Sequence, residues 1–366
     1  MLRPMVGRRA PTNATAAVAI CGLLLACSLT PQTSPPSSTV VGRDWTLTGP
    51  LPESAGAVLA GIASSSDVVV VVGLLKTGNA TNAAVWESQD GTTWTRDPDA
   101  AGFENHGLLA VALGSGRFVA LGATCGSVEC EGQAYWTSTD GISWSFAGDV
   151  GGVCCLMNAI AAGGPGFVAV GADQSTGFPQ TPADGAVSLS SSGKRWRVIQ
   201  GEPAFKAVTF GSVVAGGPGL VASGFNGKPG VWTSTDGQSW EESASDFGTG
   251  EIQAVAAGGP GFVAVGRDGQ SAMSWTSTDG VTWARASTTL GPGVMHSIIA
   301  IGGRVVAGGN AGGAAAVWSS DDGMHWIEDT GPAASAADIN RMAAFGTALI
   351  AIGSGPTGEP LVLIGR

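Results

Sequence analysis

The sequence has few charged residues, few histidines and no long apolar run beyond its first thirty residues. Only 12% of its 366 residues are Asp, Glu, Lys or Arg, and its three histidines (His106, His296 and His325) are far apart. No later segment is apolar for long enough to cross a bilayer as a helix. A nucleophile elbow, a paired-cysteine metal motif and a glycine-rich phosphate loop are also missing. The sequence therefore predicts no metal site and no cofactor.

The N-terminal segment has the features of an export signal, and we exclude it from the predicted fold. Arg3, Arg8 and Arg9 precede an apolar stretch, Ala16 to Ala26, which ends in Leu24-Leu25-Ala26-Cys27. A basic segment followed by an apolar one is typical of signal peptides, and the last four residues resemble a bacterial lipobox. We expect residues 1–26 to be a lipoprotein signal peptide, Cys27 to carry lipid such as palmitate, and residues 27–38 to form a flexible tether. An ordinary secretory signal that happens to contain a cysteine is the alternative.

Export to the outer face of the cell membrane would leave a strongly acidic protein. Removing residues 1–26 leaves 14 basic and 28 acidic residues, a net charge of −14. Such a surface repels phosphate backbones, so we expect no nucleic-acid partner.

Four cysteines follow Cys27, namely Cys125, Cys130, Cys154 and Cys155. An even number in an exported protein predicts disulfides. Two local bridges and two bridges between the segments are both compatible with the sequence. A zinc site is the other interpretation, although the spacing suits it poorly.

All twelve tryptophans belong to a repeat, W-x-S-x-D-G-x-x-W. Clear copies begin at Trp86, Trp136, Trp232, Trp275 and Trp318, and a degenerate copy with Ser192 in place of Asp ends at Trp196. The closing tryptophans lie at 94, 144, 196, 240, 283 and 326. A period of this length predicts a repeat architecture.

Each repeat contains signals for four strands. An apolar segment, a glycine-rich turn and a second apolar segment precede the tryptophan motif, in which Asp-Gly joins two further strands. The turn Gly-Gly-Pro-Gly at 163–166, 216–219 and 258–261 predicts a type II turn with proline at its second position.

Seven first hairpins are recognisable, near 58–73, 108–122, 157–171, 208–224, 252–266, 295–309 and 339–353. Only six motifs follow them. The seventh is divided between Leu361–Ile364 and Thr39–Trp45. We predict an all-β, seven-bladed β-propeller over residues 39–366, closed by strands from both chain ends.

This repeat resembles that of Asp-box (BNR-type) propellers, which include sialidases, sortilin-like propellers and photosystem-assembly propellers. Here one residue between Asp and Gly is missing in every copy. A sialidase would imply an arginine triad, a tyrosine nucleophile with a glutamate, and an aspartate acid/base. The single tyrosine, Tyr135, lies beside Trp136 in a strand, and no Arg-Ile-Pro motif precedes the first blade. The resemblance therefore implies a fold more than an activity.

The aspartates of the repeat have two interpretations, a calcium or catalytic site and a structural turn. We favour the structural one, because the carboxylates lie one blade apart and accept backbone hydrogen bonds in such turns. These structural residues are Asp90, Asp140, Asp236, Asp279 and Asp322.

The face opposite the motif turns is the expected ligand face. It carries the longer connections, placed at 97–107, 124–134, 149–157, 173–185 and 286–296. Polar residues at the starts of the first strands, with two aspartates on the rim, are the candidate ligand-binding residues; they are Asn158, Asp173, Asp184, Glu251, Gln253, His296 and Arg341. Phe103, Phe178, Phe225 and Phe247 are the only aromatic residues left for a sugar platform, unless they anchor their own loops.

These features predict a monomeric, membrane-anchored binding or scaffold module for a protein or a cell-envelope glycan, without a catalytic residue. A glycan-active enzyme that uses carboxylates at the channel mouth is the alternative, and it requires two carboxyl groups close together. An assembly factor similar to the photosystem propellers is a third, and it would imply an arginine patch.

Overall fold

The computed structural model describes residues 43–48, 51–78, 80–97, 102–125, 130–150, 155–176, 183–217, 219–287, 290–329 and 336–366. The predicted signal peptide, Cys27, the tether and residues 39–42 of the divided motif lie outside these residues. No helix within them is long and apolar enough to cross a membrane.

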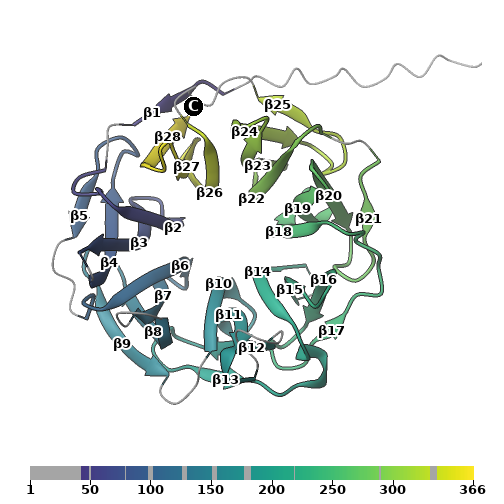
Figure 1. Ribbon diagram of the computed structural model, residues 1–366, viewed down its shortest axis with the longest axis horizontal. Helices are drawn as coiled ribbons and strands as arrows, with labels where there is room; N and C mark the ends of the chain where they lie inside the picture. Colours follow the sequence, from purple (N-terminus) through teal and green to yellow (C-terminus); the bar gives the residue numbers. More distant parts are fainter. Residues whose placement is uncertain are drawn as a thin grey trace, which may run out of the picture. The chain divides into compact units, whose positions relative to one another are not determined.

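Seven four-stranded antiparallel sheets surround a central channel, which confirms the predicted propeller (Figure 1). Blade 1 is β2 (Ala57–Ser64), β3 (Val69–Thr77), β4 (Ala80–Ser88) and β5 (Thr95–Asp97). Blade 2 is β6 (His106–Gly114), β7 (Arg117–Cys125), β8 (Cys130–Ser138) and β9 (Ser145–Val150). Blade 3 is β10 (Cys155–Gly163), β11 (Gly166–Asp173), β12 (Asp184–Ser190) and β13 (Arg197–Ile199).

The remaining blades repeat this order of strands. Blade 4 is β14 (Thr209–Gly216), β15 (Gly219–Phe225), β16 (Pro229–Ser234) and β17 (Glu241–Glu242). Blade 5 is β18 (Glu251–Gly258), β19 (Gly261–Asp268), β20 (Ser271–Ser277) and β21 (Ala284–Arg285). Blade 6 is β22 (Gly293–Ile301), β23 (Arg304–Ala311), β24 (Ala314–Ser320) and β25 (Ile327–Asp329).

Blade 7 closes the ring with strands from both ends of the described chain. Its strands are β26 (Asp338–Phe345), β27 (Ala348–Ser354), β28 (Pro360–Gly365) and β1 (Trp45–Leu47). Trp45 pairs with Gly365 and Leu47 with Leu363. The backbone N–H of Arg43 also donates to Asp329 of blade 6 at 3.1 Å, so the first strand is held by both neighbouring sheets.

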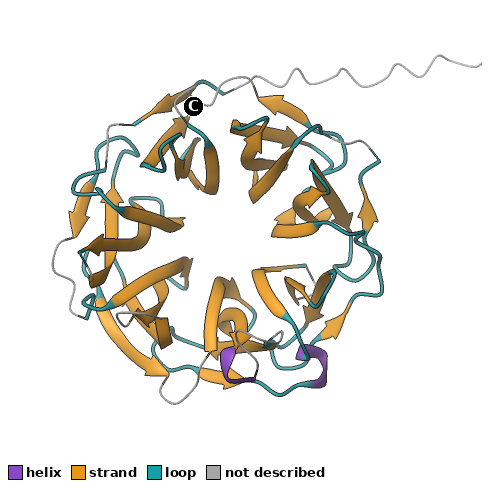
Figure 2. Cartoon of the chain, in the orientation of Figure 1, coloured by secondary structure: helices purple, strands orange, loops and turns teal. Residues whose placement is uncertain are grey.

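Two short 3-10 helices, η1 (Gln174–Thr176) and η2 (Pro203–Phe205), are the only helical segments in the described residues (Figure 2). Two of the connections predicted as loops, 124–134 and 149–157, are mostly strand instead. The β7–β8 hairpin continues to the pair Cys125–Cys130, and β9 continues to Val150, which pairs with Gln133. Alternation of small and polar residues in these segments gives a weak strand signal, but pairing with a neighbour extends them.

The core lies between the blades. The opening tryptophan of each clear motif is fully buried: Trp86, Trp136, Trp232, Trp275 and Trp318 are at most 1% exposed. Each sheet thus covers one apolar face with the next blade, and burial of such rings is the main stabilising term.

The Asp and Ser side chains of each clear motif turn accept hydrogen bonds from backbone N–H groups of the same turn. Asp140 Oδ1 accepts the backbone N–H groups of Ile142 and Ser143 at 2.9 and 2.8 Å, and Ser138 Oγ accepts that of Gly141. These backbone hydrogen bonds, that of Ser143 first, lower the pKa of Asp140 to about 2. Asp90, Asp236, Asp279 and Asp322 accept the same two amides in their own turns.

The turns between the first and second strands differ from the type II prediction. Gly163 pairs with Gly166, so Gly164 and Pro165 are the central residues. Gly164 has a φ of +56°. Positive φ at the first central position defines a type II′ turn, whose twist matches that of the strands it joins.

At this end of the channel, neighbouring first strands approach closely. A Cβ placed on Gly216 would lie 2.3 Å from the Cβ of Ala257 in the next blade. The same relation holds between Gly163 and Ala215 and between Gly258 and Ala300. The glycines of these turns therefore permit close packing around the channel as well as a tight turn.

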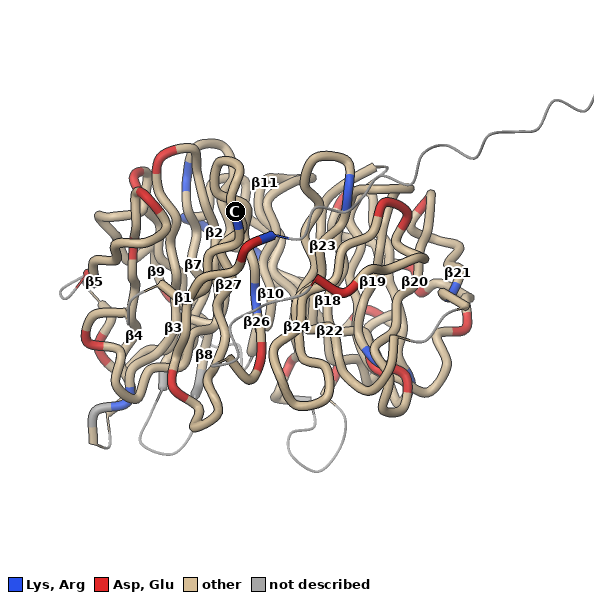
Figure 3. The backbone as a smooth tube through the Cα atoms, turned by 90° about the horizontal axis from the view of Figure 1, so that it is seen from above, with Lys and Arg blue, Asp and Glu red and all other residues tan. Residues whose placement is uncertain are grey.

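Charged residues are sparse in the described chain, and acidic segments occur at both faces of the ring (Figure 3). Neither face is therefore marked as a ligand surface by its charge alone. The geometry of the channel distinguishes them.

Candidate functional site

A β-bulge occurs at the same position in the innermost strand of every blade. In β22, for example, the pairing passes from Met295 to Ser297 and leaves His296 without a partner in the ladder. The corresponding unpaired residues are Ala60, Leu109, Asn158, Gly211, Gln253, His296 and Asn340. Bulges redirect side chains. Of these residues, all except Leu109 and Asn340 line one pocket in the channel.

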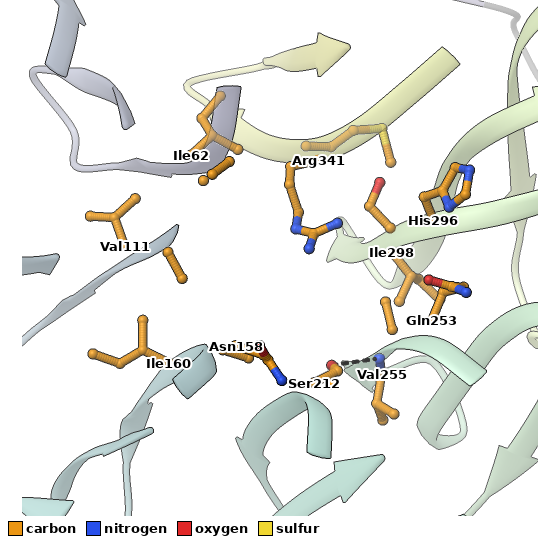
Figure 4. Close-up of a pocket in the computed structure, with 18 residues that line it drawn as sticks. Ile62, Val111, Asn158, Ile160, Ser212, Gln253, Val255, His296, Ile298 and Arg341 are labelled. Carbon is orange, nitrogen blue, oxygen red and sulfur yellow. Dashed lines mark hydrogen bonds between the residues drawn. The ribbon is translucent and has the colours of Figure 1, made fainter. Parts of the chain in front are cut away.

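The ring of bulges surrounds a pocket of about 170 Å³. Asn158, Gln253, His296 and Arg341 all line it, so the structure brings together four of the residues proposed from sequence. Ile62, Val111 and Ile160 lie together on another side of the same pocket (Figure 4). The pocket therefore has a polar part from blades 3 to 7 and an apolar part mainly from blades 1 and 2.

Arg341 extends from β26 toward the middle of the channel (Figure 4). Its Nη1 donates to the backbone carbonyl of Asn340 at 2.7 Å. None of the ion pairs within the described residues includes it. The side chain is solvent-exposed, yet the surrounding blades remove part of its hydration, and this desolvation lowers its pKa. An arginine stays charged despite such a shift, so the pocket holds a cation without an acidic partner.

The other polar residues are held by their neighbours. His296 Nε2 lies 3.1 Å from Asp338 Oδ2, and Asn310 donates to the same oxygen at 3.2 Å. Asn158 Nδ2 donates to the carbonyl of Phe210 in the next blade at 2.8 Å. These contacts fix the orientation of side chains that face the channel, which is what a preorganised binding site requires.

Glu251 lies beside the pocket rather than in its lining. Arg267 Nη2 donates to its Oε1 at 2.8 Å, and Gln253 Nε2 donates to its Oε2 at 3.0 Å. The hydrogen bond from Arg267 is the main reason that the pKa of Glu251 is lowered. This carboxylate is therefore ionised and engaged.

Asp173 and Asp184 do not line the pocket. They pair with each other across β11 and β12. Asp173 is buried and accepts the hydroxyl and backbone N–H of Ser175. Asp184 accepts the backbone N–H of Ala207, which is the main cause of its lowered pKa, and pairs with Lys206.

The residues considered for a metal site or for disulfides are the histidines and the cysteines, and the histidines are not brought together within the described residues. No group of three or more metal-ligating side chains occurs among the described residues. His325 contacts Asp322 within a motif turn, and His106 packs against Trp136. Cys154 and the side chains of Cys125, Cys130 and Cys155 lie outside the described residues, as does Phe178.

The three remaining loop phenylalanines differ in exposure. Phe103 and Phe247 are 7% and 2% exposed and belong to apolar clusters between blades. Phe225 is 49% exposed. Only Phe225 among these three therefore presents its ring to solvent.

Two serines of the pocket were not singled out from sequence. Ser212 Oγ accepts the backbone N–H of Val255 at 3.2 Å. Ser297 is buried, and its Oγ has no hydrogen-bond partner among the described residues. The signal that identifies them is their place directly after a bulge, which depends on strand register and is not visible in composition.

Comparison with known proteins supports the fold and leaves the activity open. No protein-family model and no curated protein sequence matches the chain. Among solved structures, YCF48 bound to D1 peptide is similar with a TM-score of 0.60 and 16% identity, covering 88% of this chain and 96% of that one. Virginiamycin B lyase from Staphylococcus aureus has a TM-score of 0.57 and 11% identity, covering 88% and 100%.

A sialidase from Trypanosoma rangeli is also similar, with a TM-score of 0.44 and 14% identity, covering 88% of this chain and 58% of that one. The TM-scores of YCF48 and the lyase, 0.60 and 0.57, show a shared fold, and identities of 16% and 11% show nothing beyond the fold. The neighbours include a protein solved with a bound peptide and proteins that act on substrates.

Proposed function

We propose that this chain is a membrane-anchored, extracytoplasmic binding module whose channel mouth binds a carboxylate-bearing segment of a partner protein. Arg341 carries the proposal, because it places a cation without an acidic partner in a preorganised pocket. A guanidinium binds a carboxylate through two parallel hydrogen bonds.

The lining of the pocket favours binding over hydrolysis. It contains no Asp or Glu, and Glu251, which contacts the lining residue Gln253, is paired with Arg267. A glycoside hydrolase requires two carboxyl groups on either side of the bond that it cleaves. His296 contacts Asp338, but no hydroxyl within the described residues donates to His296, so a nucleophile and base are not assembled.

A protein ligand is favoured over a glycan by the same lining. It has no Trp, Tyr or Phe on which a sugar ring could stack, whereas its apolar part suits a side chain. The peptide-bound neighbour supports the view that a propeller of this shape accommodates a peptide. Anchoring through Cys27 rests on the lipobox-like sequence and would hold the module at the outer face of the membrane.

The test is binding of fluorescent octapeptides to the whole protein in detergent, measured by anisotropy. A random library with free C-terminal carboxylates is compared with the same library amidated and depleted of Asp and Glu. We expect binders only in the first, and Arg341→Gln should weaken them by about 2 kcal/mol or more, since it removes one partner of a charge pair.

Arg304→Gln is the matched control. It removes an arginine that pairs with Asp321 at the opposite face, so it should leave peptide affinity unchanged. Binding that is indifferent to Arg341→Gln, or absent from both libraries, contradicts the proposal. Turnover of a glycan by the wild-type protein would establish the enzyme alternative instead. Radiolabelled palmitate incorporation in wild type, and its loss in Cys27→Ala, tests the anchor.

A further inference from the structure

A second cavity adjoins the channel pocket at the junction of blades 4 and 5. It has a volume of about 260 Å³ and is lined by residues of β14, β15 and β18: Thr209, Gly211, Gly224, Phe225, Glu251, Ile252 and Gln253. Gly211 and Gln253 also line the channel pocket. The two cavities therefore share a wall, and a single short segment of extended chain can reach both.

Blade 4 differs from the other blades because the residue at its bulge, where the two cavities meet, is the glycine Gly211. The other six blades carry a side chain there, from Ala60 to the larger Leu109 and His296. A Cβ placed on Gly211 would meet no atom within 4 Å. Blade 4 therefore has no side chain at the position where the two cavities share lining residues.

Phe225 gives the second cavity an apolar wall. It occupies the end of β15, where it pairs with Thr209, and is 49% exposed. The corresponding residues of the other blades are Leu74, Ala123, Ala172, Arg267, Asn310 and Ser354, so blade 4 alone has an aromatic ring at this position. A single exposed apolar side chain is common on protein surfaces. Phe225 is informative because it lines a cavity that shares Gly211 and Gln253 with the channel pocket.

The side of the second cavity formed by Glu251 and Gln253 is polar, and these polar groups already have hydrogen-bond partners. Glu251 binds Arg267 and Gln253, so the charges on this side neutralise each other and Gln253 is fixed between the two cavities. An apolar floor with a satisfied polar rim is the composition of a protein-recognition pocket. The cavity suits an uncharged apolar side chain rather than a second carboxylate.

We infer that the Phe225 cavity is the specificity subsite of the channel mouth and takes an aliphatic or aromatic side chain that lies close in sequence to the carboxylate bound by Arg341. This inference rests on the proposed function. The occupant is therefore an extended peptide segment that combines one carboxylate with a neighbouring residue such as Leu, Met or Phe.

Gly211→Leu and Phe225→Ala test the subsite. Gly211 does not have positive φ, its surroundings are open, and leucine already occupies the same bulge in blade 2 as Leu109, so Gly211→Leu should fold. Ala60→Leu adds the same bulk at the bulge of blade 1, on the lining of the channel pocket but not of the second cavity. It is the control for crowding: whatever its effect on overall affinity, it should leave the contribution of the peptide's apolar residue unchanged.

The probes are octapeptide binders and their derivatives in which the apolar neighbour of the carboxylate is changed to Ala. For the wild-type protein we expect this change to weaken binding roughly tenfold or more, as loss of one buried side chain should. For Gly211→Leu and Phe225→Ala the parent peptide should already bind more weakly, and the change to Ala should have little additional effect.

The failures are distinguishable. If Gly211→Leu and Phe225→Ala bind every peptide as the wild type does while Arg341→Gln does not, the subsite is wrong and the proposed function stands. If Ala60→Leu also removes the effect of changing the peptide's apolar residue to Ala, the subsite is overturned too, since crowding of the channel pocket would then explain both variants. If Arg341→Gln keeps full affinity, or no peptide binds, the proposed function fails and the subsite fails with it.

Discussion

Glu87 is a buried carboxyl at a position where the other clear motif copies carry a small hydroxyl residue. It is 9% exposed, and its Oε2 has no hydrogen-bond partner among the described residues. The corresponding residues of the other clear copies are Thr137, Thr233, Thr276 and Ser319, and the degenerate copy has Leu189 there. Burial, and then the charge of Asp97, raise the pKa of Glu87 to about 7.

The raised pKa of Glu87 predicts that the free energy of unfolding depends on pH. The folded protein favours the neutral carboxyl of Glu87, because the pKa is raised above its ordinary value of 4.5. The contribution of this carboxyl to the free energy of unfolding is therefore complete below pH 4.5 and is lost as the pH rises through about 7. Each pKa unit corresponds to about 1.4 kcal/mol, so the upper limit is about 3.4 kcal/mol. Water at the exposed edge of the side chain reduces this, and we expect about 1–2 kcal/mol.

Glu87→Gln removes the charge and keeps the shape. We expect it to match the wild type at pH 4.5 and to be about 1–2 kcal/mol more stable at pH 8.5. Urea denaturation of both proteins at the two pH values measures the difference. Glu328→Gln, an exposed glutamate on the outer strand of blade 6, is the control and should change neither value. A difference independent of pH, or a less stable Glu87→Gln at pH 8.5, would refute the assignment of a destabilising buried charge.

Three further predictions concern the ring. Ser192→Asp should raise the free energy of unfolding by about 1 kcal/mol or less, because it restores a carboxylate acceptor in the degenerate turn, and urea denaturation would show it. Gly216→Ala should destabilise by about 1–3 kcal/mol through contact with Ala257, and Ala257→Gly should relieve part of that loss in a double-mutant cycle; simple additivity would contradict the contact. Trp45→Ala should cost about 3–5 kcal/mol, since it removes a buried ring from the closing strand, and an unchanged melting temperature would exclude closure by β1.

The sequence by itself determined the number of blades, their order and the closure of the ring. The spacing of the tryptophans, the Asp-Gly turns and the divided seventh motif all act within short windows, because turn chemistry and strand alternation are local properties. It also indicated Asn158, Gln253, His296 and Arg341, since the topology puts the starts of first strands around the channel.

Only the tertiary structure decided which of the candidates share a pocket. Asp173 and Asp184 occupy the expected ends of strands, yet their carboxylates are engaged in blade 3. Ser297 and the open wall at Gly211 depend on a bulge, which shifts side chains by one residue and has no signature in composition. Whether Arg341 meets an acid depends on what six other blades place opposite it, and such long-range juxtaposition exists only once the ring is closed.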